Sequence, residues 1–191
     1  RQADDLERAG KSAAAAELYG RASRVATGEE RRRCFERLLA IYVRVGRQDE
    51  AIRVGLEYER WLRQIEDAAR ARGLELEIGG WYLALGHARA AEQHLRRALV
   101  DLPKAPLGPG RKARTLTNLA LAVERQGDRT RAGQAWRQVE TFARARLEDP
   151  RQGLDPRARL RCLQGLSESY RFQGRRAEAI RRLEQLLRVQ E

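Results

Sequence analysis

Two histidines are the residues of this chain whose type and spacing best suit metal binding or acid–base catalysis. His87 and His94 lie seven positions apart, so on a continuous helix they would share a face. A metal or catalytic site needs further convergent ligands, and the surrounding sequence does not present them. We therefore interpret both as surface or inter-helix histidines, and we expect no metal site and no cofactor.

A glycine-rich segment at 107–112, Leu-Gly-Pro-Gly-Arg-Lys, has the composition of a phosphate-binding loop. It lacks the G-x-x-x-x-G-K-[ST] spacing and no strand precedes it, so we interpret it as a flexible connection between repeats. The G-x-S-x-G, H-E-x-x-H and C-x-x-C patterns do not occur in the sequence. We expect the chain to be non-enzymatic, although a longer parent protein could carry an enzyme elsewhere.

The two cysteines, Cys34 and Cys162, are 128 positions apart and give no disulfide framework. We interpret them as small buried apolar residues, which is compatible with a cytoplasmic localisation. The three tryptophans, Trp61, Trp81 and Trp136, are interpreted as packing residues and not as stacking platforms for bases.

The surplus of arginine is interpreted first as solvated helix faces, and it also permits an acidic partner. The chain carries 39 basic and 27 acidic residues, a net charge of +12, and all but three of the basic residues are arginine. Arginine captures carboxylate or phosphate in a planar, bidentate geometry. The surplus also permits nucleic-acid binding, which we rank below protein binding because the acidic residues are interleaved with the basic ones. No stretch approaches the ~18 apolar residues of a membrane span, so we expect no membrane partner.

The elements that position these residues are helices throughout. Apolar residues recur at three- and four-residue spacing, as in Leu116, Leu119 and Val123, and no stretch sustains strand-like alternation. The five prolines fall in two short stretches, 103–109 and 150–156. The pattern predicts an all-α chain with helices at about 1–9, 11–26, 28–45, 48–71, 74–85, 87–101, 110–126, 128–148, 156–173 and 175–190.

Five glycines mark an internal repeat. They are followed five positions later, in every case, by an alanine: Gly10 and Ala15, Gly46 and Ala51, Gly86 and Ala91, Gly127 and Ala132, Gly174 and Ala179. Glycine permits the left-handed backbone that ends a helix, and alanine lets a second helix cross the first closely. Large apolar residues, with the exception of Gly55, recur nine positions after the glycines. The pattern predicts stacked helical hairpins.

These residues resemble the tetratricopeptide repeat (TPR) family. The segment IGGWYLALGHARAAEQHLRRALVDLP carries most of its pattern, in Ile78, Gly79, Tyr82, Gly86, Ala91, Leu95, Ala98 and Pro103. The spacing of about 40 residues and the run Thr115-Leu-Thr-Asn-Leu-Ala120 are similar to the long repeats of kinesin light chains and of bacterial signalling-regulator arrays. The resemblance implies a right-handed superhelical solenoid of about five antiparallel helix pairs. We expect one array over 1–191, with repeats at about 1–27, 28–71, 72–103, 109–148 and 156–190.

In this family the first helices line a concave groove. Carried over by repeat position, the resemblance implies a groove that is basic at both ends with an apolar middle, formed by Arg33, Arg37, Arg44, Leu76, Leu83, Arg114, Asn118, Leu121, Arg125, Arg161, Arg171 and Phe172. The expected function is a protein-interaction scaffold or sensor domain that takes an acidic, partly apolar peptide or partner. The alternatives are a nucleic-acid-binding repeat domain and an intramolecular regulatory domain of a larger signalling protein or enzyme.

The last predicted helix carries an apolar stripe without an evident partner: Ile180, Leu183, Leu186 and Leu187. Solenoids need a polar terminal unit, so we expect self-association through this end or coverage by a further repeat. The chain begins at Arg1 and contains no Met. On this basis we expect it to be a fragment or processed product of a longer protein.

Overall fold

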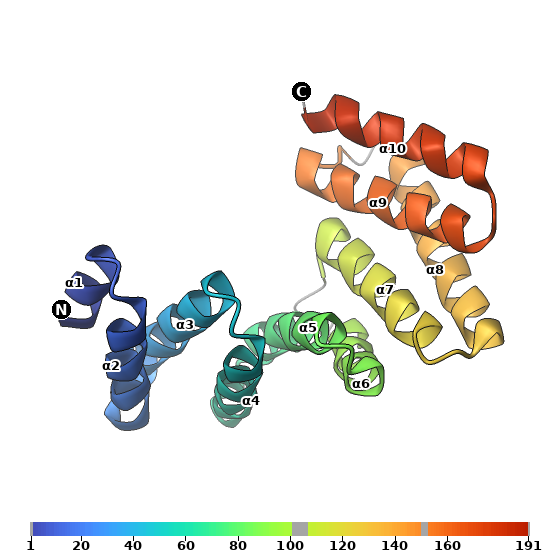
Figure 1. Ribbon diagram of the computed structural model, residues 1–191. Coiled ribbons are helices and arrows are strands. Elements are labelled where there is room, and N and C mark those ends of the chain that lie inside the picture. The colour runs from blue at the N-terminus through green and yellow to red at the C-terminus, as the bar shows by residue number, and fades with distance from the viewer. Residues whose placement is uncertain (1, 101–106, 150–152, 191) are drawn as a thin grey trace. The chain divides into compact units, whose positions relative to one another are not determined.

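The computed structural model describes residues 2–100, 107–149 and 153–190, with side chains to residue 184. These residues form ten α-helices and, within the described ranges, no strand (Figure 1). The helices are α1 (Gln2–Arg8), α2 (Ser12–Val25), α3 (Gly28–Arg44), α4 (Gln48–Gln64), α5 (Ala68–Ala84), α6 (Ala88–Leu99), α7 (Pro109–Glu124), α8 (Arg129–Glu148), α9 (Pro156–Phe172) and α10 (Arg176–Gln190). The all-α prediction is confirmed.

The helices belong to two compact units, Arg1–Trp81 and Tyr82–Glu191, whose border falls inside α5. In the first unit, successive helices pack from α1 to α4. In the second unit, α7 packs against α8 and α9 against α10, and the first helices of these two hairpins, α7 and α9, also pack against each other. The contacts of α9 with both helices of the preceding hairpin, α7 and α8, stack these two hairpins on each other.

The predicted turn glycines and crossing alanines are confirmed. Each of the five marker glycines has a positive φ, and each of the five alanines is buried. At Gly46, for example, the glycine N–H donates to the Val43 carbonyl at 3.2 Å and the Arg47 N–H donates to the Tyr42 carbonyl at 2.9 Å. This pair of hydrogen bonds is the Schellman motif, which requires a left-handed residue at the glycine position.

One predicted helix boundary is wrong. The sequence places a break near Gly73, but α4 ends at Gln64 and Gly73 lies inside α5. The turn is made by Glu66, whose φ is 58° without the help of glycine. It uses the same hydrogen bonds as the glycine turns, with the Asp67 N–H donating to the Leu62 carbonyl at 2.9 Å. The Asp67 carboxylate then accepts the Arg70 N–H at 3.1 Å and caps α5. The predicted repeat boundary at 71–72 therefore falls within a helix.

Gly55 occupies the repeat position where other hairpins carry a large side chain. A Cβ at Gly55 would lie 3.0 Å from a ring carbon of Trp81 and 3.1 Å from a side-chain carbon of Ile78. The space that a large residue fills in other hairpins is therefore occupied here by side chains of α5.

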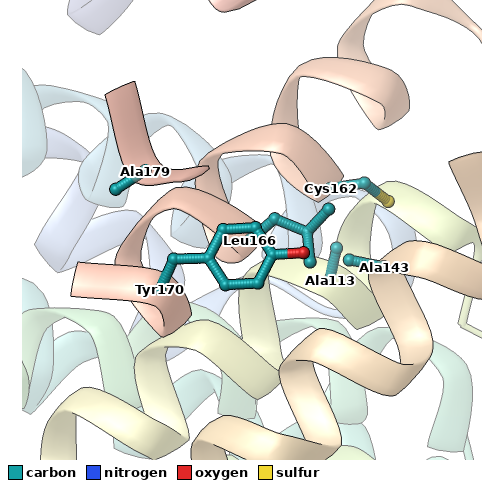
Figure 2. Close-up of a cluster of buried hydrophobic side chains, with 6 residues drawn as sticks. All are labelled: Ala113, Ala143, Cys162, Leu166, Tyr170 and Ala179. Atoms are coloured by element: carbon teal, nitrogen blue, oxygen red, sulfur yellow. The ribbon is translucent and has the colours of Figure 1, made fainter. Parts of the chain in front are cut away.

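The core of the second unit shows how the hairpins share burial. A cluster of buried residues draws on α7, α8, α9 and α10 (Figure 2), namely Ala113, Ala143, Cys162, Leu166, Tyr170 and Ala179. Burial raises the pKa of Cys162 to about 11, and that of Cys34 also rises on burial. Both thiols are free and buried, as predicted.

Part of the predicted C-terminal stripe lies outside the described side chains. Ile180 is 56% exposed and Leu183 is 50% exposed, while the side chains of Leu186 and Leu187 are not among those described. Self-association through α10 stays a prediction. Pro103, Pro106 and Pro150 also lie outside the described residues. No helix within the described ranges combines the length and apolar character needed to span a bilayer.

Candidate functional site

In the first unit, the predicted groove arginines lie along one stripe of α3. Arg33, Arg37 and Arg44 recur at helical spacing and are all exposed. Two of them face an acid of α1: an Arg44 guanidinium nitrogen is 3.4 Å from Glu7, and the nearest nitrogen of Arg37 is 3.8 Å away. These distances are longer than the 2.7–2.9 Å of a close charge-assisted hydrogen bond. The arginines are therefore loosely paired.

Glu7 and its neighbour Asp4 also hold the second helix of their hairpin. The Tyr19 hydroxyl of α2 donates to Asp4 at 2.6 Å and lies 3.3 Å from Glu7. The hydrogen bond from Tyr19 lowers the pKa of Asp4. Burial and the hydrogen bond to Asp4 raise the pKa of Tyr19. The first-helix acids thus link α1 both to α2 and to α3.

In the second unit, the predicted residues of α7 form a stripe that is half-buried until its last member. Arg114, Asn118 and Leu121 are half-buried and Arg125 is exposed. The Arg125 guanidinium donates to the Leu83 carbonyl at 2.5 Å. Arginine at this place therefore ties α7 to the end of α5 while leaving part of its side chain in solvent.

On α9, Arg161 and Arg171 are exposed and Phe172 is half-buried. Arg171 donates to Glu168 of its own helix at 2.7 Å and lies 3.8 Å from Glu124 of α7. The two helices therefore meet through an ion pair near their C-terminal ends. Phe172 packs against the Trp136 ring, with centroids 6.2 Å apart.

Two predicted groove residues are buried in packing. Leu76 is 1% exposed in the first unit and Leu83 is 7% exposed in the second. Their side chains offer almost no surface to a ligand in this structure, because both lie on the inner faces of their units. The remaining predicted residues keep at least part of their surface.

The sequence did not predict the contact that Glu124 makes with an aromatic residue of the next helix, which repeats that of Glu7. Each lies three positions before its turn glycine and faces the large aromatic residue nine positions after it. The Trp136 indole nitrogen donates to Glu124 at 2.8 Å, and Trp136 is fully buried. The signal for this pair was present as an acid and an aromatic residue at fixed distances from the glycine, in only two of the repeats.

A second feature missed from the sequence is a pocket of about 550 Å³ between the N-terminal ends of α7 and α9. It is lined by Gly108, Pro109, Gly110, Arg111, Arg114, Asp155, Arg157, Ala158 and Arg161. A Cβ on Gly110 would lie 3.0 Å from the Cα of Ala158, so glycine permits this close approach of the two helices. The segment interpreted as a flexible loop is helical from Pro109 onward, which corrects that interpretation.

The histidines and tryptophans have packing roles where the structure describes them. His94 is buried, stacks on Tyr82 with ring centroids 5.3 Å apart, and lies 2.8 Å from an Arg97 nitrogen. His87 meets the edge of the same tyrosine. Trp61 and Trp136 are buried. Within the described ranges, no group of three or more His, Cys, Asp or Glu residues could hold a metal ion.

Comparison with solved structures identifies the fold. Two crystal structures of a Podosopora anserina protein, assigned as a kinesin light chain with nearly identical TPR-like repeats, share 19% identity with this chain. They cover 99% of it and 91% and 92% of their own chains, with TM-scores of 0.70 and 0.68. BtubC (BKLC) from P. vanneervenii shares 19% identity over 98% of this chain and 76% of its own, with a TM-score of 0.68.

The chain has a TPR-like repeat fold. The likeness to TPR repeats inferred from the turn glycines and crossing alanines is thereby confirmed at the level of the fold. No protein-family model and no curated protein matches the sequence. The exposed first-helix arginines and the pocket between α7 and α9 are thus the surface features of this TPR-like array that could bind a ligand.

Proposed function

We propose that this TPR-like array is a protein-interaction module that takes an acidic, partly apolar segment of a partner along its first helices. The observation that carries the proposal is the set of exposed arginines at helical spacing on α3 of the first unit, and α7 and α9 of the second unit offer a separate set. Side chains that recur every three or four residues share one face of a helix, so several can bind one extended or helical ligand.

The internal acids support an acidic ligand. Arg37 and Arg44 already face a carboxylate, Glu7, at 3.8 and 3.4 Å. A ligand carboxylate that approached them to about 2.8 Å would form stronger charge-assisted hydrogen bonds than this loose pairing provides. Arg171 differs, since it is 3.8 Å from Glu124 but already donates to Glu168 at 2.7 Å.

Apolar contact would come from residues beside the arginines. Val43 of α3 is 47% exposed, and Leu121 and Phe172 are half-buried in the second unit. Partly exposed apolar side chains flanked by guanidinium groups suit a segment that alternates acidic and apolar residues. The same proposal treats the chain as non-catalytic and as cytoplasmic, the latter supported by two free, buried cysteines.

The test uses a random peptide library displayed on phage and selected on the purified chain. The proposal expects the selected peptides to be acidic with interspersed apolar residues. Their affinity, measured by fluorescence anisotropy, should fall at least about tenfold in the variant Arg37→Gln with Arg44→Gln, because a hydrogen bond to a charged group contributes about 1.5–3 kcal/mol.

The matched control removes the same charge from α4, the second helix of the hairpin that α3 begins. Arg53 and Arg60 are exposed on α4. Arg53→Gln with Arg60→Gln should leave peptide affinity within about twofold, because the proposed ligand does not contact α4. Selection of peptides without acidic residues, or an equal loss of affinity in both double variants, would reject the groove assignment. The nucleic-acid alternative predicts instead that the chain binds a DNA oligonucleotide, that salt weakens this complex steeply, and that Arg37→Gln with Arg44→Gln abolishes it.

A further inference from the structure

The pocket at the N-terminal ends of α7 and α9 concentrates positive charge. Arg111 and Arg114 line it from α7, and Arg157 and Arg161 line it from α9. The single carboxylate among the lining residues is Asp155. Its Oδ1 accepts the Ala158 N–H at 2.9 Å, so this acid serves as the cap of α9. Four guanidinium groups therefore share one cavity with one carboxylate that is already engaged.

Two of these arginines have no internal partner among the described residues, in contrast to Arg131 and Arg175 of the same unit. Arg131 pairs with Glu92, and Arg175 lies 3.1 Å from Glu140. Within the described part of the chain, the guanidinium groups of Arg111 and Arg157 have no hydrogen bond or ion pair. Arg161 reaches the neutral amide of Gln164 at 3.2 Å. The charges of Arg111 and Arg157 are therefore not neutralised by a carboxylate of the described chain.

The start of α7 adds backbone donors to the same pocket. Gly108 is its N-cap and supplies no side-chain acceptor. The first hydrogen bond of the helix runs from the Lys112 N–H to the Gly108 carbonyl at 3.0 Å. The N–H groups of Gly110 and Arg111 therefore have no acceptor within the helix, in keeping with the first turn of any α-helix. An anion in the pocket would meet backbone N–H groups as well as guanidinium groups.

We propose that this pocket binds a phosphate monoester. A phosphate dianion offers three acceptor oxygens to several converging donors, whereas a single carboxylate offers two. The volume of about 550 Å³ exceeds that of a phosphate group and leaves room for part of the ester's organic group. The ester can be a free small molecule or a phosphorylated side chain of a partner protein. The inference goes beyond the proposed groove function, because a free ester can occupy the pocket without a protein partner.

The first test titrates phenyl phosphate into the whole chain by isothermal calorimetry at constant ionic strength. Binding should strengthen as the pH rises through about 6, where the second phosphate ionisation completes the dianion. In Arg111→Gln with Arg157→Gln, affinity should fall at least about tenfold, because donors to a charged group are lost.

The matched control is Arg129→Gln with Arg137→Gln, which removes two exposed arginines of α8 and leaves the same net charge. It should bind phenyl phosphate within about twofold of the unsubstituted chain. An equal loss in both double variants would show a general charge effect and overturn the proposal. Absence of phenyl phosphate binding to the unsubstituted chain would overturn it as well.

A second variant separates binding from folding. A Cβ at Gly108 would have open space around it, and the residue has a negative φ of −59°. Gly108→Asp should therefore be accommodated without strain, and it supplies the missing cap to α7 while adding a negative charge beside the pocket. We expect an unchanged or raised melting temperature together with loss of phenyl phosphate binding. Binding that survives this substitution would contradict the site.

The source of the ester is resolved by a phosphoserine peptide and its unphosphorylated form. Tighter binding of the phosphopeptide than of phenyl phosphate, lost on dephosphorylation and in Arg111→Gln with Arg157→Gln, would assign the pocket to a phosphorylated partner. Equal binding of the two phosphate esters would assign it to a small molecule. Both results support phosphate recognition. Binding of the unphosphorylated peptide with the same affinity would contradict it.

Discussion

Glu7 in the first unit and Glu124 in the second occupy the same place in two different hairpins, and they are held differently. Each lies three positions before a turn glycine, faces an aromatic residue of the following helix, and lies within 3.8 Å of an arginine from the next first helix. Tyr19 has two acceptors, with Asp4 at 2.6 Å and Glu7 at 3.3 Å. Trp136 has one, Glu124 at 2.8 Å.

The difference teaches that one position can serve both packing and binding to different degrees. In the second unit the acid is committed to a fully buried indole, since Trp136 has no exposed surface. In the first unit the hydroxyl depends mainly on Asp4, so Glu7 is the weaker structural partner and is shared with Arg37 and Arg44. We infer that Arg37 and Arg44 can leave Glu7 for a ligand carboxylate, and that this costs the fold less stability than a change of partner at Glu124 would.

The largest expected difference between the two hairpins concerns the aromatic side chains. Trp136→Ala should lower the free energy of unfolding by about 3–5 kcal/mol, because a fully buried ring leaves a cavity. Tyr19→Ala should cost less, because the acids that it leaves are partly exposed. Chemical denaturation of both variants measures the contrast, with Trp136→Phe expected to fall between wild type and Trp136→Ala. Equal losses at the two rings would break the comparison.

The crossing alanines test whether both hairpins share one register. Ala132 is 1% exposed and Ala15 is 0% exposed. Replacing either with Leu should overpack the helix crossing and cost about 1–3 kcal/mol. The exposed alanines Ala145 and Ala14, on the same two helices, are the controls, and Leu there should change stability little. The melting temperatures of the four variants provide the measurement. Equal changes at the crossing and the control positions would show that the repeat register is wrong.

Removing the two acids one at a time should show a smaller difference in stability between the two hairpins. Glu124→Ala leaves the buried Trp136 nitrogen without its acceptor and should cost about 1–3 kcal/mol. Glu7→Ala should cost less than about 1 kcal/mol, because the Tyr19 hydroxyl keeps its shorter hydrogen bond to Asp4. Glu124→Gln retains an acceptor oxygen and should recover most of the loss. Urea unfolding curves provide the measurement, and a larger loss at Glu7 would reverse our interpretation.

The smallest expected difference is in pH dependence. The pKa of Tyr19 is raised in the folded state, by burial first and by its hydrogen bond to Asp4 second. The contribution of Tyr19 to folding stability is therefore complete below the ordinary tyrosine pKa of about 10. It is lost as the pH rises through the pKa that Tyr19 has in the folded state. Tyr19→Phe should flatten the alkaline fall in stability, followed by melting temperature between pH 8 and pH 11. The indole of Trp136 does not titrate, so Trp136→Phe should leave the slope of that fall unchanged.

At acidic pH, the hydrogen bond between Tyr19 and Asp4 changes the pH dependence of stability in the opposite direction. The hydrogen bond from Tyr19 lowers the folded pKa of Asp4. Its contribution is present above the unfolded pKa and is lost as the pH falls through the folded value. Tyr19→Phe should therefore also reduce the acid-induced loss of stability. An unchanged slope below pH 4 in this variant would show that the hydrogen bond is not maintained in solution.

The local turns were predictable because their physical requirement is local. A left-handed residue at a helix end favours glycine whatever surrounds it, and the crossing five residues later favours alanine in every hairpin. The sequence failed where another residue met the same requirement. Glu66 adopts a φ of 58° and forms the turn, while Gly73, which looked like a helix break, is accommodated inside α5.

The candidate site was predictable only as a set of positions. Helical spacing places Arg33, Arg37 and Arg44 on one stripe, which requires only the pitch of the helix. It could not tell that Leu76 is 1% exposed, because burial depends on which helix face meets a neighbour. Nor could it tell that Arg37 and Arg44 face Glu7, since that pairing joins residues 30 and 37 positions apart.

By itself, then, the sequence determined the helices, the glycine turns, the alanine crossings and the excess of arginine, because propensity, backbone conformation and charge belong to single residues or short spans. Tertiary structure alone decided how that charge is used. It brings Arg171 to 3.8 Å from Glu124, and leaves Arg111 and Arg157 together in one pocket without a carboxylate partner in the described chain. The physical reason is that ion pairing depends on distance in space, and only packing of α7 against α9 brings these side chains within reach.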